Sequence, residues 1–129
     1  MRKIILSAVI FGLNTFTALA DDVMTRTSDG TYIINTTKLA KDVEGYMSTT
    51  PVEVHIKKNK IVKVVPLKTM DGPKYVAKVK NGMLTKYEGM KIDKKKPLPK
   101  IDGVTGATFT SDAMREHINR AIAYYQKHK

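Results

Sequence analysis

Two short apolar runs on either side of a polar turn constrain the fold of this chain more than any other feature. In residues 52–56, valine and isoleucine alternate with polar side chains, which predicts a half-buried β-strand. Residues 57–60 are polar, and residues 61–65 form a second, mostly apolar and β-branched run. The two runs therefore predict an antiparallel hairpin with one apolar face.

Shorter elements surround the hairpin. Residues 31–35 favour a short strand. Residues 36–44 suit a short helix, with Leu39 and Val43 directed inward and Gly45 at its end.

The second half of the chain is predicted to be mainly helical. Residues 74–80 alternate as in a strand, whereas Pro73 ahead of them is typical of a helix start, so both structures stay open. Residues 83–89 predict a further helical turn, and residues 93–100 an irregular loop. The chain ends in apolar residues at helical spacing, namely Met114, Ile118, Ala121, Ile122 and Tyr125.

Together these elements predict a single α+β domain with a small, mainly antiparallel sheet and helices packed on one of its faces. Residues 31–129 form the domain in this interpretation, after an N-terminal extension at 21–30. The glycine- and hydroxyl-rich residues 102–111 run into the final helix, and we expect them at the edge of the sheet beneath that helix.

Residues 1–20 have the pattern of a secretory signal peptide. Arg2 and Lys3 precede an apolar run, and the segment ends in Ala-Leu-Ala. An uncleaved membrane anchor is the alternative, although polar residues interrupt the run. We therefore expect cleavage near Ala20 and export to the periplasm or the extracellular face of the membrane.

The composition restricts the kinds of partner. The chain has no cysteine, which excludes disulfides and thiolate metal sites, and its histidines show no ligand-like spacing, so no metal site is predicted. Loss of Arg2 and Lys3 with the leader lowers the net charge from +11 to about +9. Such a basic surface attracts an anionic membrane or an acidic redox protein, whereas export argues against nucleic acid.

Residues 102–111 have the features of a phosphate site. Gly106 and Ala107 allow close approach of the backbone, and the hydroxyls around them add short polar arms. Thr110 or Ser111 is the expected N-cap of the final helix, whose first amides favour an anion. A simple helix cap explains the same pattern, and the residue types alone do not decide between the two.

The order of residues 102–111, Asp-x-x-Thr-Gly-Ala-Thr-x-Thr-Ser, resembles the flavinylation motif of the FMN-binding domain family. That family includes the flavin-bearing subunits of sodium-pumping NADH:quinone reductase and related membrane electron-transfer complexes. Its motif ends in a Thr or Ser hydroxyl that forms a phosphoester with FMN, placed there by a flavin transferase that uses FAD. The resemblance extends upstream through Gly45, Tyr46 and the hairpin, and it favours a helix at 74–80.

The resemblance implies a role for each position of the motif. Thr108 corresponds to the acceptor of FMN. Asp102 is expected to help recognition, although a turn carboxylate bonded to its own backbone amides is an equal interpretation. Thr105 stands where serine is commoner in the family. The other expected cofactor contacts are Gly106, Ala107, Phe109, Thr110, Ser111 and Tyr46.

The isoalloxazine ring of FMN needs an apolar or aromatic wall. Tyr46, Tyr75, Tyr87 and Phe109 are candidates by residue type. Aromatic side chains mostly fill the core of a small domain, so a core role is the alternative for each of them. Tyr46 is preferred because it follows the family-like Gly45.

The resemblance therefore implies an exported flavoprotein that passes electrons to or from a membrane or extracytoplasmic redox partner. A chain this short has little room for a flavin and a selective substrate pocket, so we expect an electron-transfer domain rather than a stand-alone enzyme. No catalytic residue is predicted, because the chain shows no recognisable Ser-His-Asp arrangement and no Walker-type loop. The Thr108 hydroxyl itself is a weak nucleophile without a base to activate it. Two alternatives stay open: a module that binds FMN or another phosphate ligand without a bond, and a basic cell-envelope protein without flavin.

Overall fold

The predicted hairpin forms the centre of the sheet. In the computed structural model, which describes residues 23–129, β3 (Val52–Lys57) and β4 (Lys60–Pro66) pair antiparallel. The two turn residues Lys58 and Asn59 have φ values of 52° and 59°, the left-handed pair that a type I′ turn requires. The inward positions of β3 are fully buried, as the alternation predicted.

Two further strands extend the sheet on one side. β2 (Tyr32–Asn35) confirms the strand expected at 31–35 and pairs antiparallel with β3. β1 (Met24–Arg26) pairs antiparallel with β2, so the strand order is β1-β2-β3-β4. β1 was not predicted, because its three residues carry no alternating apolar pattern. The antiparallel sheet confirms the α+β class, whereas the leader expected at 1–20 lies outside the described residues.

The helix predicted at 36–44 is wrong: this segment is a series of turns. The Asn35 side chain accepts a hydrogen bond from the Thr37 amide at 2.9 Å, and the Thr36 hydroxyl accepts one from the Val52 amide at 2.9 Å. These local and cross-strand bonds compete with a helix that is too short to be stable alone. Leu39 and Val43 are only half-buried.

The ambiguous segment is a helix. α1 (Pro73–Gly82) begins with proline in its first turn, where a missing amide hydrogen costs nothing. A short 3-10 helix, η2 (Leu84–Tyr87), follows as predicted and packs beside β4. The chain then runs without helix or strand to the final helix, which confirms the irregular loop expected at 93–100.

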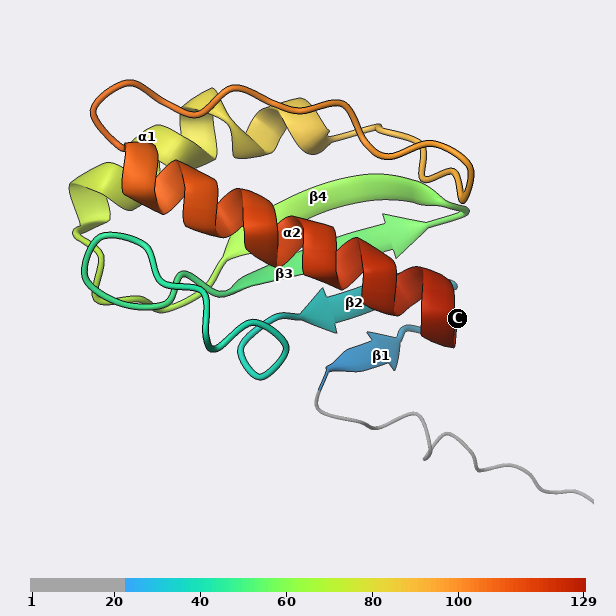
Figure 1. The fold of residues 1–129 in the computed structure, drawn as a ribbon. Coiled ribbons are helices and arrows are strands. Elements are labelled where there is room, and N and C mark those ends of the chain that lie inside the picture. The colour runs from blue at the N-terminus through green and yellow to red at the C-terminus, as the bar shows by residue number, and fades with distance from the viewer. Residues whose placement is uncertain (1–22) are drawn as a thin grey trace, which may run out of the picture.

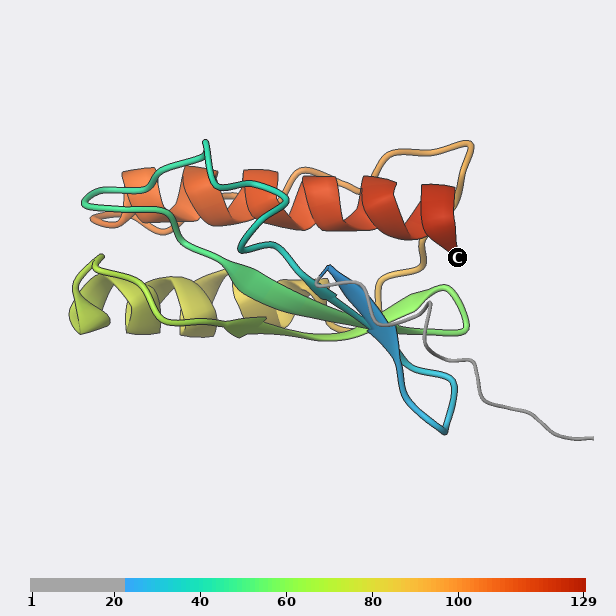
Figure 2. The ribbon, with the colours of Figure 1, turned by 90° about the horizontal axis from the view of Figure 1, so that it is seen from below.

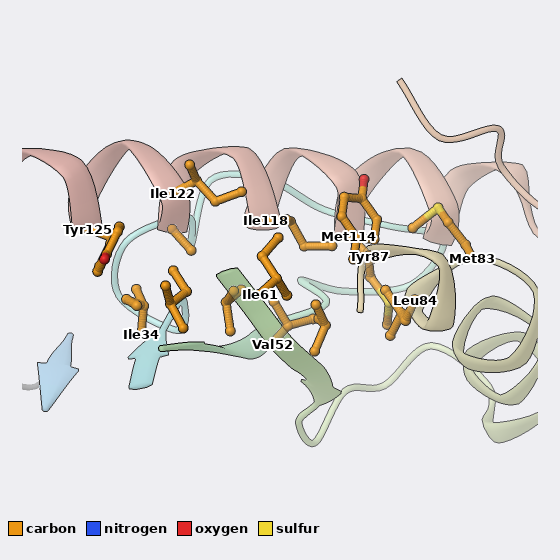
Figure 3. Close-up of a cluster of buried hydrophobic side chains, with 14 of the residues drawn as sticks. Ile34, Val52, Ile61, Met83, Leu84, Tyr87, Met114, Ile118, Ile122 and Tyr125 are labelled. Carbon is orange, nitrogen blue, oxygen red and sulfur yellow. The ribbon is translucent and has the colours of Figure 1, made fainter. Parts of the chain in front are cut away.

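α2 (Thr108–His128) is the longest element and lies across one face of the sheet (Figure 1). Figure 2 shows α2 as one layer and the sheet with α1 as the other. All five apolar positions predicted for this helix are buried. In Figure 3, Ile118 and Tyr125 point from α2 toward the strands, and Leu84 and Tyr87 complete the core near the start of α2. The starts of α1 and α2 and the turns after β2 meet at one end of the molecule (Figure 1).

His117 joins the middle of α2 to the turns at 36–44. Its ring is fully buried. Nε2 donates to the carbonyl oxygen of Val43 at 3.1 Å, so Nδ1 of the neutral ring accepts from the Thr36 hydroxyl at 2.7 Å. Burial lowers the pKa of His117, since the charged ring would lose its hydration. Within residues 23–129, no helix has the length and apolar character to cross a membrane.

Acidification is expected to destabilise the fold through His117. Because the pKa of His117 is lower in the folded than in the unfolded protein, the unfolded state binds more protons as the pH falls below the ordinary value of about 6.5. Urea unfolding should therefore give a smaller free energy at about pH 5.5 than at about pH 7.5. His117→Gln should flatten this dependence, and an unchanged slope in this variant would contradict the assignment.

Candidate functional site

The glycine- and hydroxyl-rich turn leads directly into the first turn of α2. The helix begins at Thr108, its N-cap is Ala107, and no side chain caps it. The expectation that Thr110 or Ser111 is the N-cap is therefore wrong. Both hydroxyls have other partners: Thr110 donates to Asp71 at 2.6 Å, and the Ser111 Oγ accepts from the Val104 amide at 3.0 Å. The first turn of α2 therefore begins without a capping side chain for its amides.

Asp71 is the residue that sequence reasoning missed. Its carboxylate is buried, with 2% of the residue exposed, and it accepts four hydrogen bonds. Three come from the amides of Tyr46, Met47 and Ser48, at 2.9, 2.6 and 3.0 Å. The fourth comes from the Thr110 hydroxyl in the first turn of α2. One carboxylate thus holds the loop at 45–48 against the start of α2.

The charged form of Asp71 is the stable one. Burial, the largest single influence, raises the pKa of this carboxyl, but the four hydrogen bonds together lower it below its ordinary value. Gly45 makes the close approach possible, because a Cβ there would lie 2.4 Å from Asp71 Oδ2. The glycine that the sequence suggested as a helix end is therefore required for space beside the carboxylate.

An aromatic hollow of about 260 Å³ opens where these segments meet. Tyr46 and Phe109 lie with ring centroids 6.3 Å apart in a stacked arrangement, and Tyr46 and Tyr75 lie 5.8 Å apart. The backbone of Gly106 and Ala107 and the side chains of the first turn of α2 complete the lining. Tyr46 and Phe109 are 59% and 66% exposed, so their rings are accessible to a ligand.

Three of the four aromatic candidates lie in this hollow, and one does not. Tyr87 is 1% exposed and belongs to the core beneath α2 (Figure 3). Burial raises the pKa of its phenol. Sequence alone could not separate these residues, because all four are aromatic residues near helix starts or turns.

A second, polar hollow of about 340 Å³ lies on the other side of Thr108. Asp102 and Thr105 line it, together with Lys100, Asp112 and Arg115. The Arg115 guanidinium donates to the Ile101 carbonyl at 2.8 and 3.0 Å and to Asp112 at 2.7 Å. Arg115 therefore holds the chain before the motif against α2, and it places a cation in this hollow.

Thr108 lines both hollows and is exposed. The turn before it packs against α1 rather than under the sheet edge, which corrects the expected position. A Cβ on Gly82 would lie 2.9 Å from the Val104 side chain, and one on Gly106 would lie 3.5 Å from Lys78 Nζ. Gly106 also has a φ of 85°, a conformation that favours glycine.

The predicted site residues therefore divide into two groups. Those whose side chains or backbone face the hollows are Tyr46, Asp102, Thr105, Gly106, Ala107, Thr108, Phe109 and Thr110. Ser111 is buried and holds the motif turn from within. In the part of the chain that the structure describes, no three His, Cys, Asp or Glu side chains gather as a metal site.

Asp71→Asn is expected to destabilise the protein by about 1–3 kcal/mol, because an amide cannot accept all four hydrogen bonds and one donor loses its partner. Urea unfolding measures the change. Asp102→Asn is the matched control. This carboxylate is exposed, so its replacement should change the free energy of unfolding by no more than about 0.5 kcal/mol. Equal losses of stability in the two variants would contradict the role of Asp71 as the anchor between the loop at 45–48 and α2.

Comparison with known proteins identifies the family of this chain. No curated protein and no solved structure matches the chain significantly. Residues 45–123 match the family described as FMN-binding domain. The match covers more than half of the chain and includes Asp71 and the residues that line both hollows beside Thr108. The chain belongs to the FMN-binding domain family, and it is a flavin-binding module with FMN as its cofactor.

Proposed function

We propose that this protein carries FMN covalently, through a phosphoester on the Thr108 hydroxyl, and acts as an exported electron carrier. The observation that carries the proposal is the position of Thr108. Its side chain is exposed at the first position of α2 and borders an aromatic hollow on one side and a polar hollow on the other.

The two hollows suit the two ends of FMN. The rings of Tyr46, Tyr75 and Phe109 offer flat apolar surface for an aromatic ring system. The uncapped amides of the first turn of α2 favour a phosphate, and the positive end of the helix dipole adds to this preference. Lys78 lies beside Gly106 and adds a cation at the same turn. The residues present therefore fit the cofactor.

Attachment requires a second protein. The Thr108 hydroxyl is a weak nucleophile without a base to accept its proton. A flavin transferase that uses FAD supplies this activation: the hydroxyl oxygen forms a bond to the FMN phosphorus as the pyrophosphate bond of FAD breaks and AMP leaves. The domain's own contribution is to hold the hydroxyl at the surface on a rigid helix end.

The function follows from what the bound group supplies, which is reversible uptake and release of electrons. The aromatic hollow is small and open, and leaves little room for a selective substrate pocket beside the ring. A carrier that exchanges electrons with a membrane or extracytoplasmic redox protein is therefore favoured over an enzyme with its own substrate. A covalent bond suits the exported location that the leader predicts, because a dissociated flavin would be lost outside the cell.

Thr108→Val should abolish covalent flavin, whereas Thr108→Ser should retain it, because serine keeps the hydroxyl. Each variant is exported from a host that expresses a flavin transferase, denatured, and weighed as an intact protein, and the modified residue is located by peptide mapping. The expected gain is one FMN less one water.

Valine has the shape of threonine, so equal unfolding free energies of the two variants exclude loss of the fold as the cause. Flavin that is bound in the folded protein but lost on denaturation would favour the non-covalent module. Covalent flavin in Thr108→Val would exclude Thr108 as the acceptor.

A further inference from the structure

The exposed apolar side chains of this protein are concentrated around the aromatic hollow. Among the described residues, five large apolar side chains are exposed, and Val62 on β4 is the one that lies elsewhere. The other four are Tyr46, Met47, Met70 and Phe109, with exposures of 59, 62, 77 and 66%. We call these four residues the apolar rim.

Asp71 holds the apolar rim together. Its carboxylate accepts the amides of Tyr46 and Met47, Met70 precedes it in the chain, and its fourth partner Thr110 follows Phe109. The Met70 amide also donates to the Ser48 hydroxyl at 2.9 Å. The three separate segments that carry these four exposed side chains are thus joined by one buried carboxylate.

Holding a flavin does not account for the whole apolar rim. Tyr46 and Phe109 line the aromatic hollow, but Met47 and Met70 do not. Exposing methionine to water is unfavourable, and methionine and aromatic residues are enriched where proteins contact one another. Methionine is also flexible enough to fit more than one partner surface. The two methionines therefore point to a protein partner.

The charges around the apolar rim indicate the kind of partner. Lys68 lies two residues before Met70, and Lys74 and Lys78 lie on α1 on either side of Tyr75. All three are exposed, and none takes part in the ion pairs found within residues 23–129. The acidic side chains of the neighbouring segments are Glu44, Asp102 and Asp112, of which Asp112 is paired with Arg115.

We propose that the apolar rim and these three lysines form the docking surface for a redox protein with an acidic, apolar-centred face. This inference rests on the proposed function, because it places the partner where the flavin is held. The net charge of about +9 that remains after loss of Arg2 and Lys3 with the leader attracts an acidic protein and repels a second copy of this chain. Four apolar side chains and three lysines make a small contact, which suits a weak, short-lived complex, as electron transfer between proteins requires.

The test measures electron transfer to the exported, flavinylated protein by stopped flow. The donor is a reduced plant-type ferredoxin, an acidic protein whose iron–sulfur cluster is oxidised as the flavin is reduced. Met47→Ser, Met70→Ser and the double variant are compared with Val62→Ser, which removes an exposed apolar side chain on β4 outside the apolar rim. Lys74→Glu is compared with Lys63→Glu, which makes the same change of charge at an exposed position on β4, outside the proposed surface.

We expect the double methionine variant and Lys74→Glu each to lower the second-order rate constant at least about fivefold, while both β4 controls stay near the parent value. Added salt should also lower the rate of electron transfer from ferredoxin, because it screens the attraction between opposite charges. Added salt should raise the rate at which a basic cytochrome c reoxidises the flavin, because it screens repulsion. FMN content by intact mass and the midpoint potential should be the same in all variants, which shows that the flavin site is intact.

Two results would overturn the docking surface while leaving the carrier function in place. One is full flavinylation with equal rates in the double methionine variant and Val62→Ser. The other is a dimer that forms with rising protein concentration and is lost in the methionine variants, since the surface would then belong to a second copy. Absence of FMN from the parent protein would instead contradict the proposed function, so the two failures are distinguishable.

Discussion

The site depends on one buried carboxylate. Asp71 joins its own segment to two others that are far from it in sequence, and it can stay charged in the interior because four donors converge on it. The distance in sequence between Asp71 and its helix partner Thr110 is 39 residues. Without this connection, the loop that carries Tyr46 and the helix turn that carries Phe109 would have no common anchor, and the aromatic hollow between them would lose its shape.

The long helix α2 makes the position of Thr108 rigid. Three polar contacts along its length hold it to the loops and turns around the sheet: Thr110 to Asp71 at the start, His117 to Thr36 in the middle, and Tyr125 to Asn59 near the end, the last at 2.6 Å. The buried apolar face between these contacts fixes the rotation of the helix (Figure 3). A hydroxyl at the first position of such a helix is held in one place.

Two unlike surroundings meet at that hydroxyl. The aromatic hollow offers flat apolar surface, and the polar hollow and the helix amides offer donors and cations. This division matches the two chemical ends of FMN, the cofactor of the family to which the chain belongs. The apolar rim lies outside both hollows at Met47 and Met70, and the proposed docking surface accounts for these side chains.

The sequence by itself determined the elements whose pattern is local. Alternation over residues 52–56 and the apolar run at 61–65 predicted the hairpin, and helical spacing predicted the buried face of α2. The motif at 102–111 predicted Thr108 as the acceptor of FMN, and this role stays a prediction. Only the tertiary structure decided features that depend on distant partners. Thr36 bonds to β3 and to α2 and so replaces a predicted helix by turns, and the Thr110 hydroxyl serves Asp71 instead of capping its own helix. Among aromatic residues that the sequence could not distinguish, Tyr87 is buried in the core and Tyr46 is exposed at the surface. Local spacing carries no information on which side chains meet across the fold, and the buried carboxylate that connects them has no signature in the sequence around it.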